Sequence, residues 1–408
     1  MDAAPGLGTS VALGAGKTVV RLSDRAGVPT TGGPASASAA TTGLSVSGNQ
    51  ILKEGQVFVP RGFVMKGLLD NPTVKGACMT NGGDKSADSV FNATSWNKIR
   101  NFWHANSVRI HISQSGLLGG GNKDGVGHII TDAMADSYVG YIETKIKAVT
   151  DTGLVVVLSM QDEALSCGWT DALPTSSTKT AWDRLLSRKG TDSIRNSPHV
   201  IVNLYNEPDM LYSSADWNQW RNGGTGPVPV NGCDGTRPCN HGRVPLGHQD
   251  LINSIRNMGV TNVIAADGAN LGRKFSGMYP NYMLHDASPG RGVVYDIHPF
   301  FYTDGPSGWD SRWGFLLNSS GPNVPVFAGA WNFRSSECGT ATADMAPDFI
   351  DYMKRRGIGI TVYAWDARVG QGVVKDWNGN PNLGHCPAPD QQAELPGTVY
   401  ASYLDSFS

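Results

Sequence analysis

Eight short apolar runs, most of them rich in β-branched residues, recur along the chain between residues 61 and 365. They are RGFVM (61–65), SVRIHI (107–112), LVVVLSM (154–160), HVIVNLY (199–205), NVIAA (262–266), VVYDI (293–297), VPVFAG (324–329) and IGITVYAW (358–365). Amphipathic segments typical of helices separate most of them. Apolar strands that alternate with helices indicate a parallel sheet covered by helices. Eight such units favour an α/β fold of the closed (β/α)8 barrel type over an open doubly wound sheet.

Two regions of different composition divide the chain. Residues 1–43 are rich in Gly, Ala, Ser and Thr, which is typical of an N-terminal arm or linker. Residues 44–408 form the predicted barrel domain, which opens with a β-hairpin over 44–60 and turns at Gly48-Asn49 and Glu54-Gly55. The 51 Gly and 23 Pro favour long loops at the C-terminal face, of which GLLGGGNKDGVGH (116–128) is one.

The charge balance argues against several classes of partner. Lys and Arg number 33 against 35 Asp and Glu, so the formal net charge is −2, and no basic run stands out. We therefore expect neither a nucleic-acid interface nor an anionic-membrane patch. No apolar stretch reaches the ~18 residues that a membrane-spanning helix needs. We expect a monomer.

Six cysteines in loop-like contexts favour disulfides and a secreted, extracellular protein. Cys233 and Cys239 enclose the short loop DGTRP, and Cys338 and Cys386 follow the seventh and eighth strands. Cys78 and Cys167 would then pair between the loops after strands 1 and 3. The expected disulfides are thus Cys233–Cys239, Cys338–Cys386 and Cys78–Cys167; free buried thiols are the alternative. The start MDAAPG is typical of a mature secreted chain with an added initiator Met.

A carboxylate directly follows the fourth apolar run, in the sequence Tyr205-Asn206-Glu207-Pro208. Functional residues of such barrels stand at the C-terminal ends of the strands. A Glu held there is partly desolvated, which raises its pKa toward use as a general acid. The alternative is a Glu that merely ends a strand and caps the next helix.

This motif and its neighbours resemble the family-5 glycoside hydrolases, the cellulase- and mannanase-like retaining barrels. The resemblance runs from about residue 44 to about residue 380. It includes VPRGFVMKG, SVRIHIS, DIHPFFY and VYAWD as the first, second, sixth and eighth strands. Because the strand-4 motif is specific, the resemblance implies that Glu207 is the acid/base of an O-glycosyl hydrolase.

The resemblance places the nucleophile at the end of strand 7, where the family has Glu after Gly and before an aromatic residue. This chain has Gly329-Ala330-Trp331. Alanine cannot attack a sugar carbon, so three interpretations stay open. The chain is an engineered inactive variant, which we favour, or a natural non-catalytic relative that binds glycans. In the third, the nucleophile is displaced to Glu337, whose simpler explanation is an exposed loop acid.

Further catalytic roles follow from the resemblance. Arg109 would hydrogen-bond the nucleophile carboxylate, although an ordinary salt bridge inside the barrel is the alternative. Asn206 would donate to the sugar 2-hydroxyl, and His298 would contact the acid/base or the sugar. The family's aromatic hydroxyl two residues after this His is replaced by Phe300, and Tyr302 is the candidate substitute.

The substrate contacts are expected from aromatic and polar residues at the strand ends. Flat indole rings stack on the apolar faces of sugars. The family's His after strand 3 is absent, and Gln161, Asp162 and Glu163 stand there instead. The expected substrate-binding residues are Trp365, Trp331, Trp169, Gln161 and Asp267, with Asn270 more weakly supported.

The resemblance therefore implies a retaining β-glycoside hydrolase that acts on a β-linked glycan or glycoside by double displacement. This chain would be inactivated at residue 330. A carbohydrate-binding barrel without catalysis is the alternative. No metal or organic cofactor is expected, because only His111 and His298 stand at strand ends, too few for a metal site.

Overall fold

The computed structural model describes most of the chain from residue 43 onward. The described ranges are 43–69, 90–123, 128–161, 171–190, 194–209, 214–224, 244–287, 290–300, 305–333, 345–365, 372–386 and 394–407. The expected arm, Trp169, Tyr302, Asp162, Glu163, Glu337 and five of the six cysteines lie outside these residues, so their assignments stay predictions. Cys386 is described; it is buried and disulfide-bonded, and its partner lies outside the described part.

Eight parallel strands close into a barrel, which confirms the predicted (β/α)8 fold. They follow each other around the barrel in chain order, and the last pairs with the first. The strands are β4 (Gly62–Met65), β5 (Ser107–Ser113), β8 (Val155–Gln161), β9 (Val200–Asn203), β10 (Ile264–Asp267), β11 (Val293–Ile297), β12 (Val326–Trp331) and β13 (Ile360–Val362). Each falls within or beside one of the eight apolar runs of the sequence.

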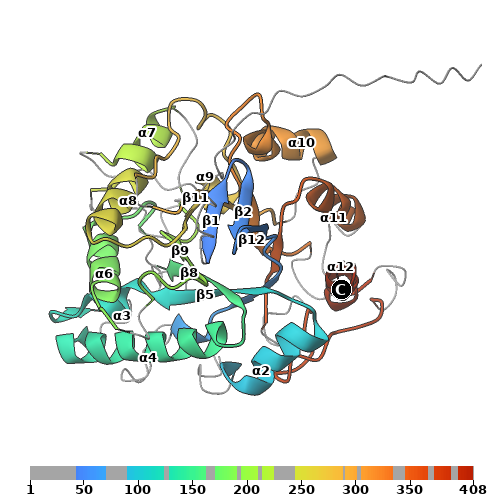
Figure 1. Ribbon diagram of the computed structural model, residues 1–408, viewed down its shortest axis with the longest axis horizontal. Coiled ribbons are helices and arrows are strands. Elements are labelled where there is room, and N and C mark those ends of the chain that lie inside the picture. Colours follow the sequence, from blue (N-terminus) through green and yellow to red (C-terminus); the bar gives the residue numbers. More distant parts are fainter. Residues whose placement is uncertain are drawn as a thin grey trace, which may run out of the picture. The chain divides into compact units, whose positions relative to one another are not determined.

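Helices surround these strands, as Figure 1 shows for α4, α6, α8 and α11. The longest of the described helices is α4, whose N-cap Thr131 accepts a hydrogen bond from the Met134 amide. The helices are α2 (Ala93–Asn97), α3 (Gln114–Leu118), α4 (Asp132–Thr150), α6 (Ser176–Leu186), α7 (Ser214–Asn222), α8 (His248–Asn257), α9 (Ala269–Gly272), α10 (Gly305–Arg312), α11 (Ala346–Arg355) and α12 (Pro396–Asp405). Single turns of 3-10 helix cover Gly67–Leu69 and Gly314–Leu317, and a π-helical turn covers Lys98–Phe102.

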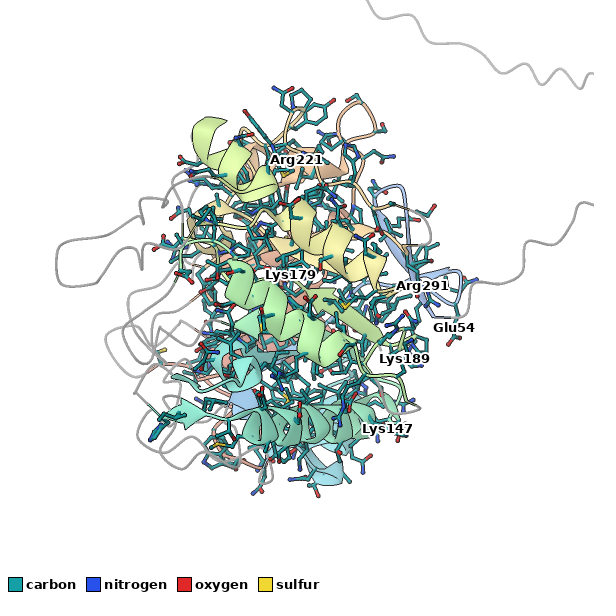
Figure 2. The ribbon with its side chains drawn as sticks, turned by 90° about the vertical axis from the view of Figure 1, so that its left-hand side faces the viewer. Glu54, Lys147, Lys179, Lys189, Arg221 and Arg291 are labelled. Carbon is teal, nitrogen blue, oxygen red and sulfur yellow. The ribbon has the colours of Figure 1, made fainter. Side chains whose placement is uncertain are left out.

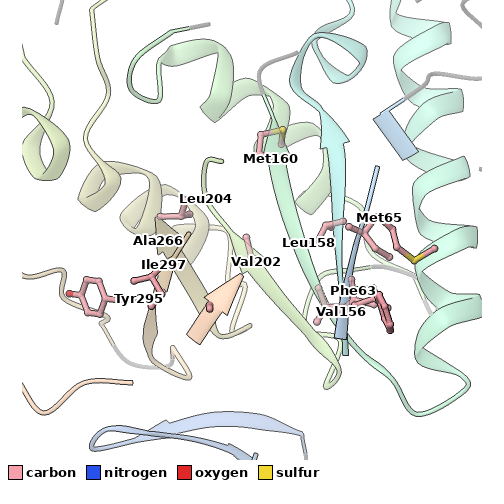
Figure 3. Packing of buried hydrophobic residues seen from close by; sticks show 14 of the residues in the cluster. Phe63, Met65, Val156, Leu158, Met160, Val202, Leu204, Ala266, Tyr295 and Ile297 are labelled. Atoms are coloured by element: carbon pink, nitrogen blue, oxygen red, sulfur yellow. The ribbon is translucent and has the colours of Figure 1, made fainter. Parts of the chain in front are cut away.

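The main apolar core lies between the strands and the helices. Side chains alternate along a strand, so every second residue faces the helix layer. Figure 3 shows such outward-facing residues, among them Phe63, Leu158, Val202 and Ile297. The helices contribute buried faces in return, for example Trp182 of α6, which has no exposed surface.

A second, smaller core fills the N-terminal end of the barrel interior. Val157, Ile201, Ala265 and Phe327 meet there from different strands. The predicted hairpin, β1 (Leu44–Ser47) and β2 (Gln50–Lys53), adds Leu44 and Ile51 to this cluster, and β3 (Gln56–Val57) extends its sheet. The Leu44 and Val46 amides donate to the Pro198 and Arg291 carbonyls, just before β9 and β11. The hairpin therefore closes the end of the barrel opposite the strand ends that carry the predicted site.

The charged side chains of the outer helices are spread out, as Figure 2 shows for Lys147 of α4 and Lys179 of α6. Lys147 pairs with Asp151 at 2.7 Å, one helical turn further on. Such exposed pairs contribute little stability each. Among the described residues, no helix combines the length and the apolar character that crossing a membrane requires.

Replacing Gly62 by Ala should destabilise the barrel. A Cβ atom there would lie 1.7 Å from the Ser107 carbonyl oxygen of the neighbouring strand, so β4 and β5 would have to separate. We expect the free energy of unfolding to fall by at least about 2 kcal/mol in urea titrations, as for overpacking generally. Gly190→Ala is the control, because a Cβ there meets nothing within 4 Å. Equal stability of the two variants would contradict the prediction.

Candidate active site

Above the second, smaller core, the interior of the barrel is lined by polar residues. They stand two apart in the buried strands: Arg109 and His111 in β5, Ser159 and Gln161 in β8, and Asp296 and His298 at the end of β11. Residues two apart face the same side of a strand, so these side chains share the interior. All six are buried. They lie at the C-terminal end, where the sequence predicted the site.

Arg109 is the hub of this interior and has no exposed surface. Its Nη2 donates to Ser159 Oγ at 3.1 Å and to Asp267 Oδ2 at 3.2 Å, and its Nε lies 3.4 Å from Asp296 Oδ2. Its Nη1 donates to Asn206 Oδ1 at 3.0 Å. Its ionic partners among the described residues are thus the two aspartates. This is the interior salt bridge that was the alternative expectation.

The two aspartates are fully buried, and every oxygen has a partner. Asn203 Nδ2 donates to Asp267 Oδ1 at 2.6 Å and to Asp296 Oδ2 at 2.8 Å. Asp267 Oδ2 accepts from the Glu207 amide at 2.9 Å, and Asp296 Oδ1 accepts from the Gly329 amide at 2.7 Å. Asp267 was expected to bind substrate; this placement corrects that expectation, because the protein itself uses both oxygens.

Asp267, Asp296 and His298 also bring potential cation ligands within 4.8 Å of one another. Their carboxylate oxygens already accept from Asn203, two backbone amides and, for Asp267, the Arg109 guanidinium. Such pairing neutralises buried carboxylates without an ion. We therefore describe the group as an ion-pair network.

His111 is held as a neutral imidazole with a defined tautomer. Arg109 Nη1 lies 2.9 Å from His111 Nε2, and arginine only donates, so Nε2 accepts. The proton is then on Nδ1, which donates to Gln161 Oε1. Burial and the Arg109 charge keep the pKa of His111 well below its usual range. Gln161 is therefore engaged by His111, and its expected contact with substrate stays a prediction.

Glu207 follows β9 and points to His298. Its carboxylate Oε1 lies 2.7 Å from His298 Nδ1, and the Glu207 side chain is 22% exposed while His298 is fully buried. The backbone of Glu207 has φ of +52°, a left-handed conformation that is strained for a residue other than glycine. The structure thus brings the predicted acid/base and the predicted histidine together.

The charges around this pair decide its protonation. Burial alone raises the pKa of Glu207, but the His298 hydrogen bond and the charges of His298, Arg109 and Arg273 outweigh it, so the pKa is lowered. This corrects the expectation of a raised pKa. Burial by itself lowers the pKa of His298, but the charge of Asp267 and the contacts with Asp296 and Glu207 raise it to about 9. Burial and the Asp296 charge raise the pKa of Asp267 to about 6.

Ala330 lies in β12 one residue after Gly329, whose amide binds Asp296. Its side chain is 3% exposed and packs against Val64 and Ala364, with Phe300 and Tyr363 at the edge of the cluster. Lys66 donates to the Tyr363 hydroxyl at 2.8 Å nearby. The position belongs to the interior of the barrel mouth, as expected.

The two described tryptophans of the predicted sugar site are packed inside the protein. Trp331 stacks on Phe349 of α11 with 5.3 Å between ring centroids. A register shift in β12 between Ala328 and Trp331 accompanies this outward placement. Trp365 meets Phe63 edge to face at 4.9 Å, and both indoles are only 3% exposed. Little indole surface is therefore exposed for the expected stacking on a sugar.

Sequence reasoning missed Asn203, Ser159 and Asp296. The sequence did contain a signal for them, since each is a polar residue at an inward position of an otherwise apolar strand. Each also lies two residues from another inward polar residue, or beside one on the neighbouring strand. Their partners could not be read from the sequence, because Asn203 bridges residues 64 and 93 positions away.

Taken together, the parts define a (β/α)8 barrel with a carboxylate–imidazole pair at the C-terminal ends of its strands, the place where barrel enzymes carry their active sites. Residues 71–369 match the family model for cellulase, glycosyl hydrolase family 5. The chain belongs to this family, which supports glycosyl hydrolase activity in general. No curated protein matches the chain.

Solved structures share the fold at low identity. A β-glucanase from Saccharophagus degradans is 17% identical, with 93% of this chain and 98% of that one covered and a TM-score of 0.56. The endoglucanase Cel5A of Thermobifida fusca is 16% identical over 88% and 96%, with a TM-score of 0.54. A β-mannanase from Streptomyces thermolilacinus is 16% identical over 90% and 97%, with a TM-score of 0.52.

The charged His298 should make stability depend on pH. Its pKa is higher in the folded chain, about 9, than the ordinary value of 6.5, so its stabilising contribution is complete below about pH 6.5 and is lost toward pH 9. Between pH 7 and 9, the free energy of unfolding should fall by on the order of 2 kcal/mol more than in His298→Asn. Urea titrations at each pH measure this difference. Parallel pH curves for the two proteins would contradict it.

Proposed function

We propose that the chain has the architecture of a retaining β-glycoside hydrolase, with Glu207 as acid/base and residue 330 as the nucleophile position. The observation that carries the proposal is the pairing of a partly exposed Glu207 with buried His298 at the end of the fourth strand. Family membership supports it. The two-carboxylate mechanism needs a second carboxylate across the sugar, about 5 Å from the first. In our proposal, residue 330 stands at the strand end that would carry it.

With a glutamate in place of Ala330, the reaction would proceed by two displacements. The carboxylate introduced at this position attacks the anomeric carbon while Glu207 gives its proton to the leaving oxygen. Glu207 then takes a proton from water, which attacks the same carbon and releases the sugar with retention. Asn206 accepts from Arg109 through Oδ1, which leaves Nδ2 as the group to donate to the sugar 2-hydroxyl.

The lowered pKa of Glu207 fits the loss of a second carboxylate. A general acid must be protonated when the substrate binds. A carboxylate at position 330 would be a like charge near Glu207, and like charges raise the pKa of a neighbouring acid. With Ala at this position, the cations Arg109, Arg273 and His298 act on Glu207 without this opposition. The chain thus has a base at Glu207 but neither nucleophile nor effective acid.

The alternative is a barrel that binds glycan without catalysis. Ala330 itself favours it, because the side chain fits between Val64 and Ala364 as part of an apolar cluster. Under this alternative, glycan affinity is the function and the polar network only supports the fold. Glu337 as displaced nucleophile lies outside the described residues.

The substrate class in our proposal is a β-linked glycan such as a β-glucan or β-mannan, supported by the β-glucanase and the β-mannanase that share the fold. Because such polymers occur outside cells, and because Cys386 is disulfide-bonded, we propose that the protein acts extracellularly.

Ala330→Glu should restore hydrolysis of an activated aryl β-glycoside. We expect kcat/KM to rise on the order of 10³-fold or more, because the missing group forms the covalent intermediate. The panel should contain aryl β-glucosides, β-mannosides and β-cellobiosides, and NMR of the first product should show the β-anomer. Ala330→Gln is the matched control, since it has the same shape but no nucleophile.

Two outcomes would contradict the proposal. A folded Ala330→Glu protein at background activity on the whole panel would favour the binding barrel. Activity that survives Glu207→Gln in the Ala330→Glu protein, on a substrate that needs acid assistance, would remove Glu207 from its role.

A further inference from the structure

Asp267 contacts the predicted acid/base Glu207 by two routes. Directly, its Oδ2 accepts the Glu207 backbone amide at 2.9 Å. Indirectly, the same oxygen lies 3.4 Å from His298 Nε2, while His298 Nδ1 lies 2.7 Å from Glu207 Oε1. One buried carboxylate thus reaches the main chain of Glu207 and, through the imidazole, its side chain.

The direct contact acts on a strained segment. Glu207 is left-handed at φ +52° and precedes Pro208, a combination that needs its surroundings to hold it. The Pro208 carbonyl accepts from the Leu271 amide at 3.0 Å, and Asn270, Leu271 and Gly272 are themselves left-handed. Since Asp267 immediately precedes this turn, β10 and the turn after it hold the Glu207 segment at two points.

The indirect contact depends on a fixed imidazole. The His298 amide donates to the Gly272 carbonyl at 2.8 Å, and a Cβ at Gly272 would lie 2.8 Å from the His298 ring. The ring is therefore pressed against backbone and cannot turn freely. The charged groups that face it are Arg109 from β5, Asp267 from β10, Asp296 from β11 and Glu207, and Arg273 adds its charge at Glu207.

Asp296 makes a useful contrast. It shares Asn203 and Arg109 with Asp267, but its backbone partner is the Gly329 amide beside residue 330, not Glu207. Each aspartate thus holds a different strand end. We propose that Asp267 is a positioning residue for the acid/base: it fixes the Glu207 backbone directly and keeps His298 aimed at the Glu207 carboxylate. This inference rests on the proposed function where it calls Glu207 the acid/base. The contacts of Asp267 with Glu207 and His298 do not depend on turnover.

The test is NMR on the full chain labelled with ¹⁵N at histidine and glutamate only. In the unmodified protein, both His298 ring nitrogens should carry protons at pH 7, and the Glu207 amide resonance should move with the Asp267 carboxyl near pH 6. Asp267→Asn should lower the pKa of His298 by at least one unit, a tenfold loss of proton affinity. It should also abolish the movement of the Glu207 amide near pH 6.

Two controls separate positioning from general damage. Asp296→Asn should preserve the pH-dependent movement of the Glu207 amide but shift it to lower pH, because the Asp296 charge helps to raise the pKa of Asp267. Asp286→Asn breaks another largely buried ion pair, with Arg256 at 2.6 Å, and should not change the pKa of His298. If Asp267→Asn does not fold, the unmodified chain still decides: a neutral His298 at pH 7, or a Glu207 amide insensitive to pH near 6, would overturn the proposal.

A kinetic arm links the two proposals without confusing them. In the Ala330→Glu protein, Asp267→Asn should move the basic limb of kcat/KM upward by about one pH unit, because a less charged His298 no longer lowers the pKa of Glu207. An inactive Ala330→Glu protein in which Asp267→Asn still lowers the pKa of His298 would contradict only the proposed function. An active Ala330→Glu protein in which Asp267→Asn shifts neither the pH profile nor the NMR signals would contradict only the positioning role.

Discussion

The buried charge of Arg109 is the constraint on which the mouth of this barrel depends. A guanidinium without exposed surface must be surrounded by acceptors, and Asp267, Asp296, Asn206 and Ser159 supply them from four strands or strand ends. Removing one partner of such a network leaves an uncompensated buried charge, which typically costs about 3–5 kcal/mol. Because Asp267 and Asp296 also accept from the Glu207 and Gly329 amides, the ion network and the site geometry cannot be separated.

This arrangement also sets the charge balance around Glu207. The cations near Glu207 favour its ionised form, and His298 lies between the Glu207 carboxylate and the two buried aspartates. In our proposal, a second carboxylate at position 330 would balance those cations, and Ala at this position provides no such charge. The packing of Ala330 with Val64 and Ala364 fills that position with apolar atoms. Fold and network are thus retained around a position that has no reactive group.

The sequence predicted a large part of the fold and of the site. All eight strands, the hairpin and the location of Glu207 and His298 followed from periodicity and from resemblance, because strand ends in such barrels are determined by where apolar runs stop. The pKa of Glu207 did not follow, since it depends on cations that come from distant strands. The placement of the tryptophans did not follow either: Trp331 lies beyond a register shift in β12, which turned it outward onto Phe349.

What the sequence determined by itself, then, is the order of the elements, the closed barrel and the residue types at each strand end. Local patterns decide these, because side-chain alternation and apolar length act within a few residues of one another. Only the tertiary structure decided that Asp267 accepts from the Glu207 amide and that Asp296 accepts from the Gly329 amide, beside residue 330. These contacts join residues that are 60 and 33 positions apart, and closure of the barrel brings them within hydrogen-bond distance.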